Sequence, residues 1–258
     1  MTSVPLTHTH PDLPPSVTRP QPPSFARRDG RLNPRRQRAW ERHGERYLLD
    51  VPRARATTSV DPAHLLDHRA EFGRDAPLVV EIGSGAGEVV AHAAGKRPDL
   101  DFLAVEVYRP GIAQTLARVG RDDLSNVRLV LANAVDVVRT MLPAGGVTEV
   151  WTFFPDPWPK ARHHKRRLVD DEFAGLVARV LAPGGVWRLA TDWAGYAEQM
   201  LEVAARCPHL TNRYAGHAPD ADGIPGVAPR FPGRAMTRFE AKGLAAGRTV
   251  RDLELVRR

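Results

Sequence analysis

From residue 61 onward, short apolar runs alternate with segments of helical periodicity, and this alternation constrains the fold more than any other feature. The runs predict buried strands at 78–82, 102–107, 127–131, 149–154 and 186–190. Helices are expected at 88–95, 112–119, 135–142, 170–182 and 193–205. Strands and helices at this spacing predict a doubly wound, Rossmann-like α/β fold, whose mainly parallel sheet carries helices on both faces.

The segments beside this pattern are less regular. Asp61 followed by Pro62 is typical of a helix start, so a helix is expected from there to about Phe72. Pro and Gly residues within 208–235 predict a loop, and alternating residues at 250–256 predict a last strand at the sheet edge. We therefore expect one α/β domain over 61–258.

The basic charge of the chain is concentrated before this domain. The 258 residues carry 37 Lys and Arg against 30 Asp and Glu, a net charge of +7, and residues 1–55 hold eleven of the former and five of the latter. Seven prolines predict a disordered tail over 1–26, and ten arginines with two aromatic residues define an Arg-rich arm at 27–60. Such an arm favours nucleic acid first and a membrane surface second as partner, or is a solvated charge run.

Composition also excludes several classes of protein. The single cysteine, Cys207, rules out an intrachain disulfide and favours a cytoplasmic location. No apolar run approaches the ~20 residues of a membrane span, so no membrane partner is expected. The N-terminus has no Lys or Arg before Arg19 and no apolar segment typical of a signal peptide. His163 and His164 lack partners at metal-ligand spacing, so no metal is expected.

A glycine-rich turn follows the first predicted strand, in the run from Glu81 to Gly87. Dinucleotide-binding turns need glycine at the first, third and sixth positions, and here the sixth is Glu88. A carboxylate at that position opposes a pyrophosphate. The acidic residue before the turn instead favours a ligand that carries positive charge and no phosphate.

S-adenosylmethionine has these properties, because it carries a sulfonium and an ammonium group. Glu106 ends the second predicted strand, where a carboxylate can accept hydrogen bonds from both ribose hydroxyls. Asn133 follows the third, where its amide carbonyl can accept one from the adenine amino group. Ligands bind at the carboxyl ends of such strands, so Glu81, Gly83 and Gly85 complete the predicted cofactor site. A structural turn with helix caps is the alternative.

The run from Phe153 to Arg167, FFPDPWPKARHHKRR, is the most informative stretch of the sequence. Its prolines stiffen the loop and hold Asp156 beside the expected methyl donor. Five cations follow it: Lys160, Arg162, Lys165, Arg166 and Arg167. A carboxylate followed by cations suits a nucleic-acid base and its phosphates. Trp158 fits base stacking and a lid on the pocket equally well, and a capped turn beside a solvated face is the alternative for the whole run.

With these residues, the chain resembles the bacterial tRNA (guanine-N7)-methyltransferases, which are class I S-adenosylmethionine-dependent enzymes. The matching runs are Glu81–Gly83, Phe102–Val107, Phe153–Arg167, Ala190–Trp193 with Tyr196, and Thr237–Glu240. The match extends from about Gly30 to the C-terminus. The resemblance implies that 61–258 is a methyltransferase domain that methylates guanine 46 in the tRNA variable loop. It implies tRNA as partner, and a monomer or homodimer with no obligate partner subunit.

The resemblance also implies roles for individual residues. Asp156 is the implied catalytic residue and shares the cofactor positions with Glu81, Glu106 and Asn133. The implied substrate positions are Lys160, Asp192, Thr237, Arg238, Phe239 and Glu240. The family often has Asp in place of Asn133, but an Asn still accepts one hydrogen bond. Asp192 is also a candidate N-cap of the helix at 193–205.

Three other functions compete with this interpretation. A methyltransferase acting on a small molecule is disfavoured by the arginines of 27–60 and by the basic run. A non-catalytic RNA-binding subunit is disfavoured by the intact glycines, Glu106 and Asp156. An NAD oxidoreductase is disfavoured by Glu88.

Overall fold

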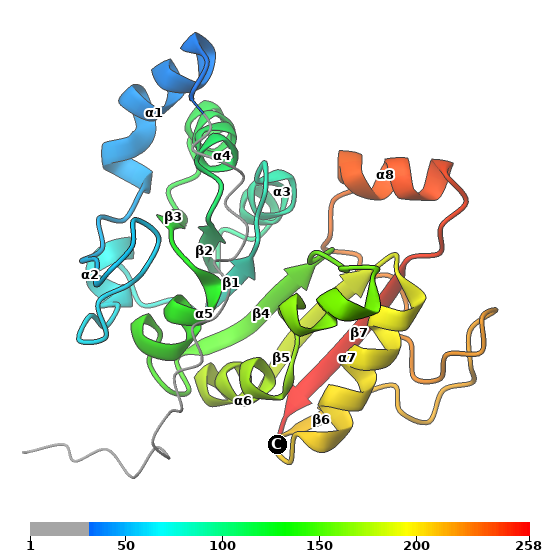
Figure 1. Cartoon of the computed structure of the whole chain (residues 1–258). Coiled ribbons are helices and arrows are strands. Elements are labelled where there is room, and N and C mark those ends of the chain that lie inside the picture. The colour runs from blue at the N-terminus through cyan, green and yellow to red at the C-terminus, as the bar shows by residue number, and fades with distance from the viewer. Residues whose placement is uncertain (1–30) are drawn as a thin grey trace, which may run out of the picture.

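The computed structural model describes residues 31–258, so the predicted tail at 1–26 and the first residues of the arm lie outside the described part of the chain. Over that part the chain forms one sheet (Figure 1). Its strands are β1 (Leu78–Ile82), β2 (Asp101–Glu106), β3 (Val127–Leu131), β4 (Val147–Phe153), β5 (Leu181–Thr191), β6 (Leu210–Asn212) and β7 (Arg251–Arg257).

The strand order confirms the predicted doubly wound fold. The order across the sheet is β3-β2-β1-β4-β5-β7-β6. The neighbouring strands from β3 to β5 pair in parallel, whereas β7 pairs antiparallel with both β5 and β6. The order reverses between β1 and β4, and a doubly wound sheet binds its ligand outside the carboxyl ends of the strands at such a point.

Helices cover both faces of the sheet, as expected. The helical segments are α1 (Pro34–Tyr47), α2 (His68–Phe72), α3 (Glu88–Lys96), α4 (Arg109–Arg121), α5 (Ala134–Asp136) continuing into the π-helical turn η1 (Val137–Met141), the 3-10 helix η2 (Ala161–Arg166), α6 (Asp171–Val180), α7 (Ala194–Arg206) and α8 (Arg238–Ala245). Residues of α1, α3 and α4 share one buried cluster with the sheet, and those of α2, α5, α6 and α7 share another. The sheet therefore separates two apolar layers (Figure 1).

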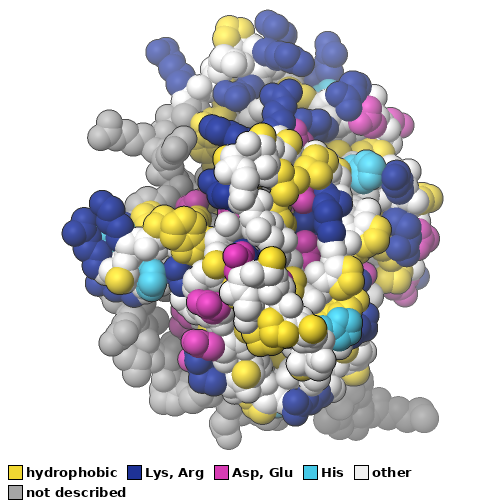
Figure 2. Space-filling view, turned by 90° about the vertical axis from the view of Figure 1, so that its right-hand side faces the viewer, with side chains coloured by type: hydrophobic (Ala, Val, Ile, Leu, Met, Phe, Trp, Pro, Cys, Tyr) yellow, Lys and Arg dark blue, Asp and Glu magenta, His cyan; other side chains and the backbone are white. Residues whose placement is uncertain are grey.

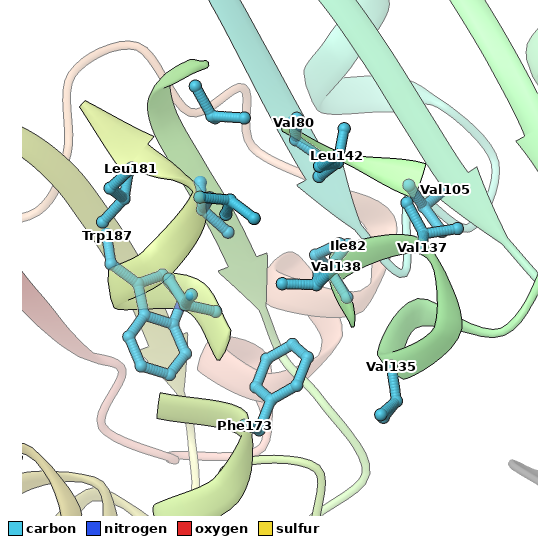
Figure 3. Close-up of a cluster of buried hydrophobic side chains, with 14 of the residues drawn as sticks. Val80, Ile82, Val105, Val135, Val137, Val138, Leu142, Phe173, Leu181 and Trp187 are labelled. Carbon is cyan, nitrogen blue, oxygen red and sulfur yellow. The ribbon is translucent and has the colours of Figure 1, made fainter. Parts of the chain in front are cut away.

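The second of these layers is the larger, and aromatic side chains occupy its centre. Phe173 of α6 and Trp187 of β5 meet edge to face with their ring centroids 5.8 Å apart. Figure 3 shows the ring of Phe173 below Val138 of η1, with the ring of Trp187 to its left. The indole N–H of Trp187 donates to the hydroxyl of Thr152 on the next strand, so this polar group is satisfied within the core.

The described part of the Arg-rich arm is packed into the same fold. Asn33 caps α1, and Tyr47 at its end is fully buried against α4. The chain then runs along the sheet edge, where the Leu49 N–H donates to the Leu129 carbonyl at 2.8 Å. Val51 and Val60 join the core, so the packed region begins well before residue 61.

Three local predictions were wrong. Asp61 does not start a helix, because the segment to residue 67 is irregular and Asp67 caps the short α2 instead. Residues 210–212, expected as loop, form β6. The last strand was expected at the edge of the sheet, but β7 lies between β5 and β6. The last two predictions failed because these strands form through pairing with segments distant in the sequence, which a local sequence pattern does not reveal.

A substitution at Gly87, at the N-terminus of α3, can test how closely α3 packs against α4. Gly87 has φ 70°, and a Cβ there would collide with the buried side chain of Thr115 on α4. Gly73 has the same φ with open space around it. We expect Gly73→Ala to cost about 1–2 kcal/mol of unfolding free energy through backbone strain alone. Gly87→Ala should cost about 1–3 kcal/mol more through overpacking. Urea denaturation measures both, and equal losses would contradict the packing described here.

Candidate active site and cofactor pocket

A pocket of about 970 Å³ opens beside the carboxyl ends of β1, β2 and β4. Seven of the residues predicted from the sequence line it: Gly83, Glu106, Asn133, Asp156, Lys165, Arg166 and Arg167. The pocket lies where the strand order reverses, which is the position the fold predicts for a ligand. Residues at or just after the ends of β1, β2, β3 and β4 are thus brought together at one site.

Backbone donors fix the carboxylate of Glu106 at the end of β2. Its Oε2 accepts from the Gly85 N–H at 2.8 Å, and its Oε1 accepts from the N–H groups of Val107 and Tyr108 at 2.7 and 2.9 Å. Burial raises the pKa of Glu106, these backbone donors oppose the rise, and the charge of Asp156 adds to it. The glycine turn therefore orients an acceptor on the pocket wall.

Glu81 is a buried acid without a compensating cation. Its residue is only 4% exposed, and its Oε2 has no hydrogen-bond partner among the described residues. Burial raises its pKa to about 8, against a smaller opposing effect of the Val90 backbone and a small further rise from Glu106. A buried oxygen without a partner indicates a ligand group, and a cationic one suits this site.

Asn133 has a structural role beside its predicted contact with the cofactor. It caps α5, with its Oδ1 accepting from the Val135 N–H at 2.8 Å. Its backbone N–H donates to the carbonyl of Thr58 at 2.6 Å, which ties the segment after α1 to the pocket rim. An adenine amino group would share Oδ1 with this cap, because a carbonyl oxygen accepts two hydrogen bonds.

The loop after β4 holds Asp156 in a strained turn. Phe154 and Trp158 have φ values of 53° and 44°, in the left-handed region that side chains other than glycine seldom adopt. Non-glycine residues held there cluster at functional sites. Asp156 lies between them, exposed within the pocket, and makes no hydrogen bond with any described residue. Its acceptors are available to a ligand.

The basic residues after Asp156 divide into two groups. Lys160, Arg162, Lys165 and Arg166 lie on or next to η2, with Arg166 partly covered through its stacking on Trp158, 5.1 Å from the ring centroid. Arg167 is buried and donates to the carbonyls of Pro157 and Gly195 and to Gln199. The predicted RNA contact at Arg167 is therefore corrected, because its guanidinium holds the loop from inside.

Asp192 follows β5, and its carboxylate faces Arg248. The Arg248 Nε lies 2.9 Å from Oδ2, an ion pair whose atoms are not aligned for a hydrogen bond, so Oδ2 stays without a hydrogen-bond partner. The predicted N-cap role was wrong, because the N-cap of α7 is Trp193 and the hydroxyl of Thr191 accepts from its N–H. The Asp192 carboxylate is thus buried and held by Arg248 beside the end of β5.

The Thr237–Glu240 segment forms the start of α8. Thr237 caps the helix by accepting from the Glu240 N–H at 3.0 Å. Arg238 is 94% exposed at its side chain, and the half-exposed ring of Phe239 lies 5.2 Å from that of Phe154. Phe239 therefore connects α8 with the loop that carries Asp156.

A buried ion network fixes this segment. Arg234 is fully buried and pairs with both Glu240 and Asp252, while its guanidinium lies 5.1 Å from the ring centroid of Phe153. Glu240 also pairs with Arg230 at 2.9 Å. The structure therefore corrects the role of the Glu240 side chain, which belongs to the scaffold because arginines engage both of its oxygens.

Sequence reasoning missed Arg234 and Arg248. Both lie in or beside Pro- and Gly-rich loops, where a lone arginine carries no pattern. Only the return of the chain to β7 places them against carboxylates. The sequence indicated these arginines only indirectly: the carboxylates that they pair with, Asp192 and Glu240, were both expected at the site.

The pocket fits S-adenosylmethionine. Glu106 lines it, and its oriented carboxylate suits hydroxyl donors. Glu81 does not line it but lies next to Ile82, which does, and its buried partnerless oxygen suits a cationic group. Across the described residues, no three His, Cys, Asp or Glu side chains group as a metal site does. No helix within 31–258 combines the length and apolar character that crossing a bilayer requires. The strand order, and a pocket with carboxylates at the point where that order reverses, are those of a class I S-adenosylmethionine-dependent methyltransferase.

Comparison with known proteins identifies the family. Residues 75–253 match the model of a family described as "Putative methyltransferase". A tRNA (guanine-N(7)-)-methyltransferase of Arthrobacter sp. (strain FB24) is 48% identical over 272 residues, covering 90% of this chain and 85% of the relative. One from Acidovorax sp. (strain JS42) is 43% identical over 91% of this chain and 86% of its own length. The chain belongs to the tRNA (guanine-N7)-methyltransferase family.

More distant proteins of known structure resemble the chain as well. The 16S rRNA methyltransferase KamB aligns with a TM-score of 0.49 at 15% identity, over 75% of this chain and 94% of that one. TrmN from Thermus thermophilus aligns with a TM-score of 0.49 at 18% identity, over 74% of this chain and 46% of that one.

The buried acid of Glu81 predicts a pH dependence of stability. Its pKa is raised in the folded state, so the unfolded chain loses the proton first, and stability falls as pH rises from about 4.5 towards about 8. Relative to Glu81→Gln, the cofactor-free protein should lose about 2–3 kcal/mol of unfolding free energy between pH 5.5 and 7.5. Urea denaturation at both pH values measures this. Parallel profiles of the two proteins would refute the burial of a protonated Glu81.

The ion network under α8 predicts a large difference between two arginines. Arg234→Met leaves Glu240 and Asp252 buried without their shared cation, so we expect a loss of about 3–5 kcal/mol in unfolding free energy. Arg230 is partly exposed and pairs with Glu240 alone, so Arg230→Met should cost about 1 kcal/mol or less. Chemical denaturation compares them. Similar losses in both variants would show that the network does not fix α8.

Proposed function

We propose that this chain transfers the methyl group of S-adenosylmethionine to N7 of guanine 46 in the variable loop of tRNA. The observation that carries the proposal is the position of Asp156, which shares a pocket with Glu106 and begins the segment that leads to the cations of η2. A base at Asp156 would lie beside the methyl donor while its strand meets these cations. The activity named for the relatives supports guanine N7 as the acceptor.

The chemistry requires orientation rather than proton removal. Guanine N7 carries a lone pair and no proton, so no general base is needed to expose it. S-adenosylmethionine, when bound, supplies an electrophilic methyl group on a sulfonium. Positive charge then develops on the guanine ring, and a carboxylate that accepts from its N1–H and 2-amino group binds the transition state more strongly than the ground state. Asp156 has the free acceptors for this role.

The remaining predicted positions surround this base site. Asp192, whose carboxylate pairs with Arg248, serves as a second carboxylate toward the substrate. Thr237, Arg238 and Phe239 at the start of α8 contact the RNA beside Phe154. On the other side, Lys160, Arg162, Lys165 and Arg166 contact its phosphates. The tRNA is thus held from two directions around the pocket.

A tRNA substrate also bears on where the chain acts. A tRNA substrate and the single cysteine of the chain together favour a cytoplasmic location.

A monomer or homodimer without an obligate partner subunit remains our expectation. Sedimentation of the purified chain measures its oligomeric state.

Asp156 provides the sharpest test of the mechanism. Asp156→Asn loses acceptor capacity and negative charge beside the developing cation, so we expect turnover to fall about a hundredfold. Affinity for S-adenosylmethionine should stay within about tenfold, because Glu81 and Glu106 remain. Glu172→Gln removes a carboxylate from the same pocket lining and should keep near-normal turnover. Single-turnover methylation of tRNA and calorimetric binding separate the two effects. Full activity of Asp156→Asn would contradict the orienting role of this carboxylate.

The proposed substrate is tested with transcripts of one tRNA that differ only at position 46. With labelled S-adenosylmethionine, the transcript with guanine should gain one methyl group, located by nuclease digestion and mass spectrometry at N7 of that nucleotide. The transcript with adenine should gain none, because adenine lacks the N1–H and 2-amino donors. Methylation of both transcripts alike, or of a metabolite mixture instead, would overturn the proposal.

A further inference from the structure

A second hollow lies between α1 and α4, away from the methyl-donor pocket. Its volume is about 750 Å³, and arginines dominate its lining. Four of them come from α1 and two from α4: Arg35, Arg36, Arg38, Arg42, Arg118 and Arg121. We call this hollow the α1–α4 groove. No acidic residue lines it, and although Arg118 and Arg121 pair with Glu88 and Asp122 beside it, the α1 arginines give it an excess of positive charge.

Four of the five arginines of α1 have no ion-pair partner within the described chain. Arg35, Arg36, Arg38 and Arg42 form no ion pair with any residue of 31–258. Arg35, Arg38 and Arg42 follow one another at spacings of three and four, so they share a helix face where like charges repel. An anion in the groove removes this repulsion, and the arrangement therefore favours an external polyanion.

The groove is built by tight packing rather than by a loose arm. Asn33 caps α1, Ala39 is buried, and Tyr47 anchors the C-terminal end of the helix. His43 lies so close to α4 that a Cβ at Gly120 would collide with its ring. The arginine side chains therefore extend from a fixed helix, and a ligand need not order that helix on binding.

Arg238 connects the groove with the active site. It lines the α1–α4 groove, and its backbone N–H donates to Glu88 at the start of α3. The next residue, Phe239, contacts Phe154, two positions before Asp156. Figure 2 shows Lys and Arg side chains gathered along the upper part of one face of the molecule. Cations thus continue from the groove to the start of α8.

We propose that the α1–α4 groove binds the sugar-phosphate backbone of the substrate tRNA, on the side of the methylated guanine opposite to η2. Arginine suits this ligand because its planar fork donates two hydrogen bonds to one phosphate. The 14-residue α1 spans about 21 Å, enough to follow several phosphates. The inference rests on the proposed tRNA substrate, but it concerns binding and not the methylated position.

The test compares two triple variants with the same loss of charge. Arg35, Arg38 and Arg42 are changed to Ala in the first, and Arg97, Arg206 and Arg258, which line neither hollow, in the control. Affinity for one unmodified tRNA is measured across a range of salt concentrations. The groove variant should bind about tenfold or more weakly, with a log–log salt slope shallower by about 2. The control should keep the slope of the unchanged protein.

Two further measurements make the result specific. Calorimetric affinity for S-adenosylmethionine should be the same in all proteins, which shows that the groove variant is folded. Changing the three groove arginines to Lys keeps the charge, so most of the salt slope should return while affinity recovers only in part. An unchanged salt slope in the alanine variant overturns the proposal, whereas a different methylated nucleotide would overturn only the proposed function.

Discussion

The site depends on the burial of two carboxylates, Glu81 and Glu106, at the carboxyl ends of neighbouring strands. No cation among the described residues pairs with either, and burial raises the pKa of both. Such burial destabilises the empty fold, and the two apolar layers of the sheet must offset it. A ligand that brings positive charge and hydroxyl donors removes this penalty. Affinity for the methyl donor and the stability of the fold are therefore coupled through the same two side chains.

The arginines complement this constraint because none of those described forms an ion pair with either carboxylate. Some are internal: Arg167 holds the loop of Asp156, and Arg234 holds the start of α8. Others are at the surface, on η2 and along the α1–α4 groove. The arginines of the described chain are thus divided between the scaffold and the two surfaces proposed to bind RNA. Two buried carboxylates at the proposed donor site can then coexist with basic surfaces proposed to attract a polyanion.

Periodicity and the order of motifs predicted the sheet and most of the pocket. Strands buried on both faces give apolar runs, and the residues that follow them, such as Glu106 and Asp156, meet at one edge. Side-chain partners across the sheet could not be predicted. The sequence of η2 gives no reason why Arg167 turns inward while its neighbours do not, since the carbonyls that accept from it come from distant segments. The packing of α1 could not be predicted either, because it requires a glycine at position 120, far along the chain, to leave room for the ring of His43.

The most direct test of the central claim is calorimetry of S-adenosylmethionine binding at pH 6.5 in two buffers with different heats of ionisation. A buried Glu81 is protonated at that pH before binding and ionises beside the cationic ligand, so protons should pass to the buffer. The measured heat should then differ between the buffers, and this difference should shrink in Glu81→Gln. Heats that do not depend on the buffer would contradict the account, because Glu81 would then already be charged in the empty pocket.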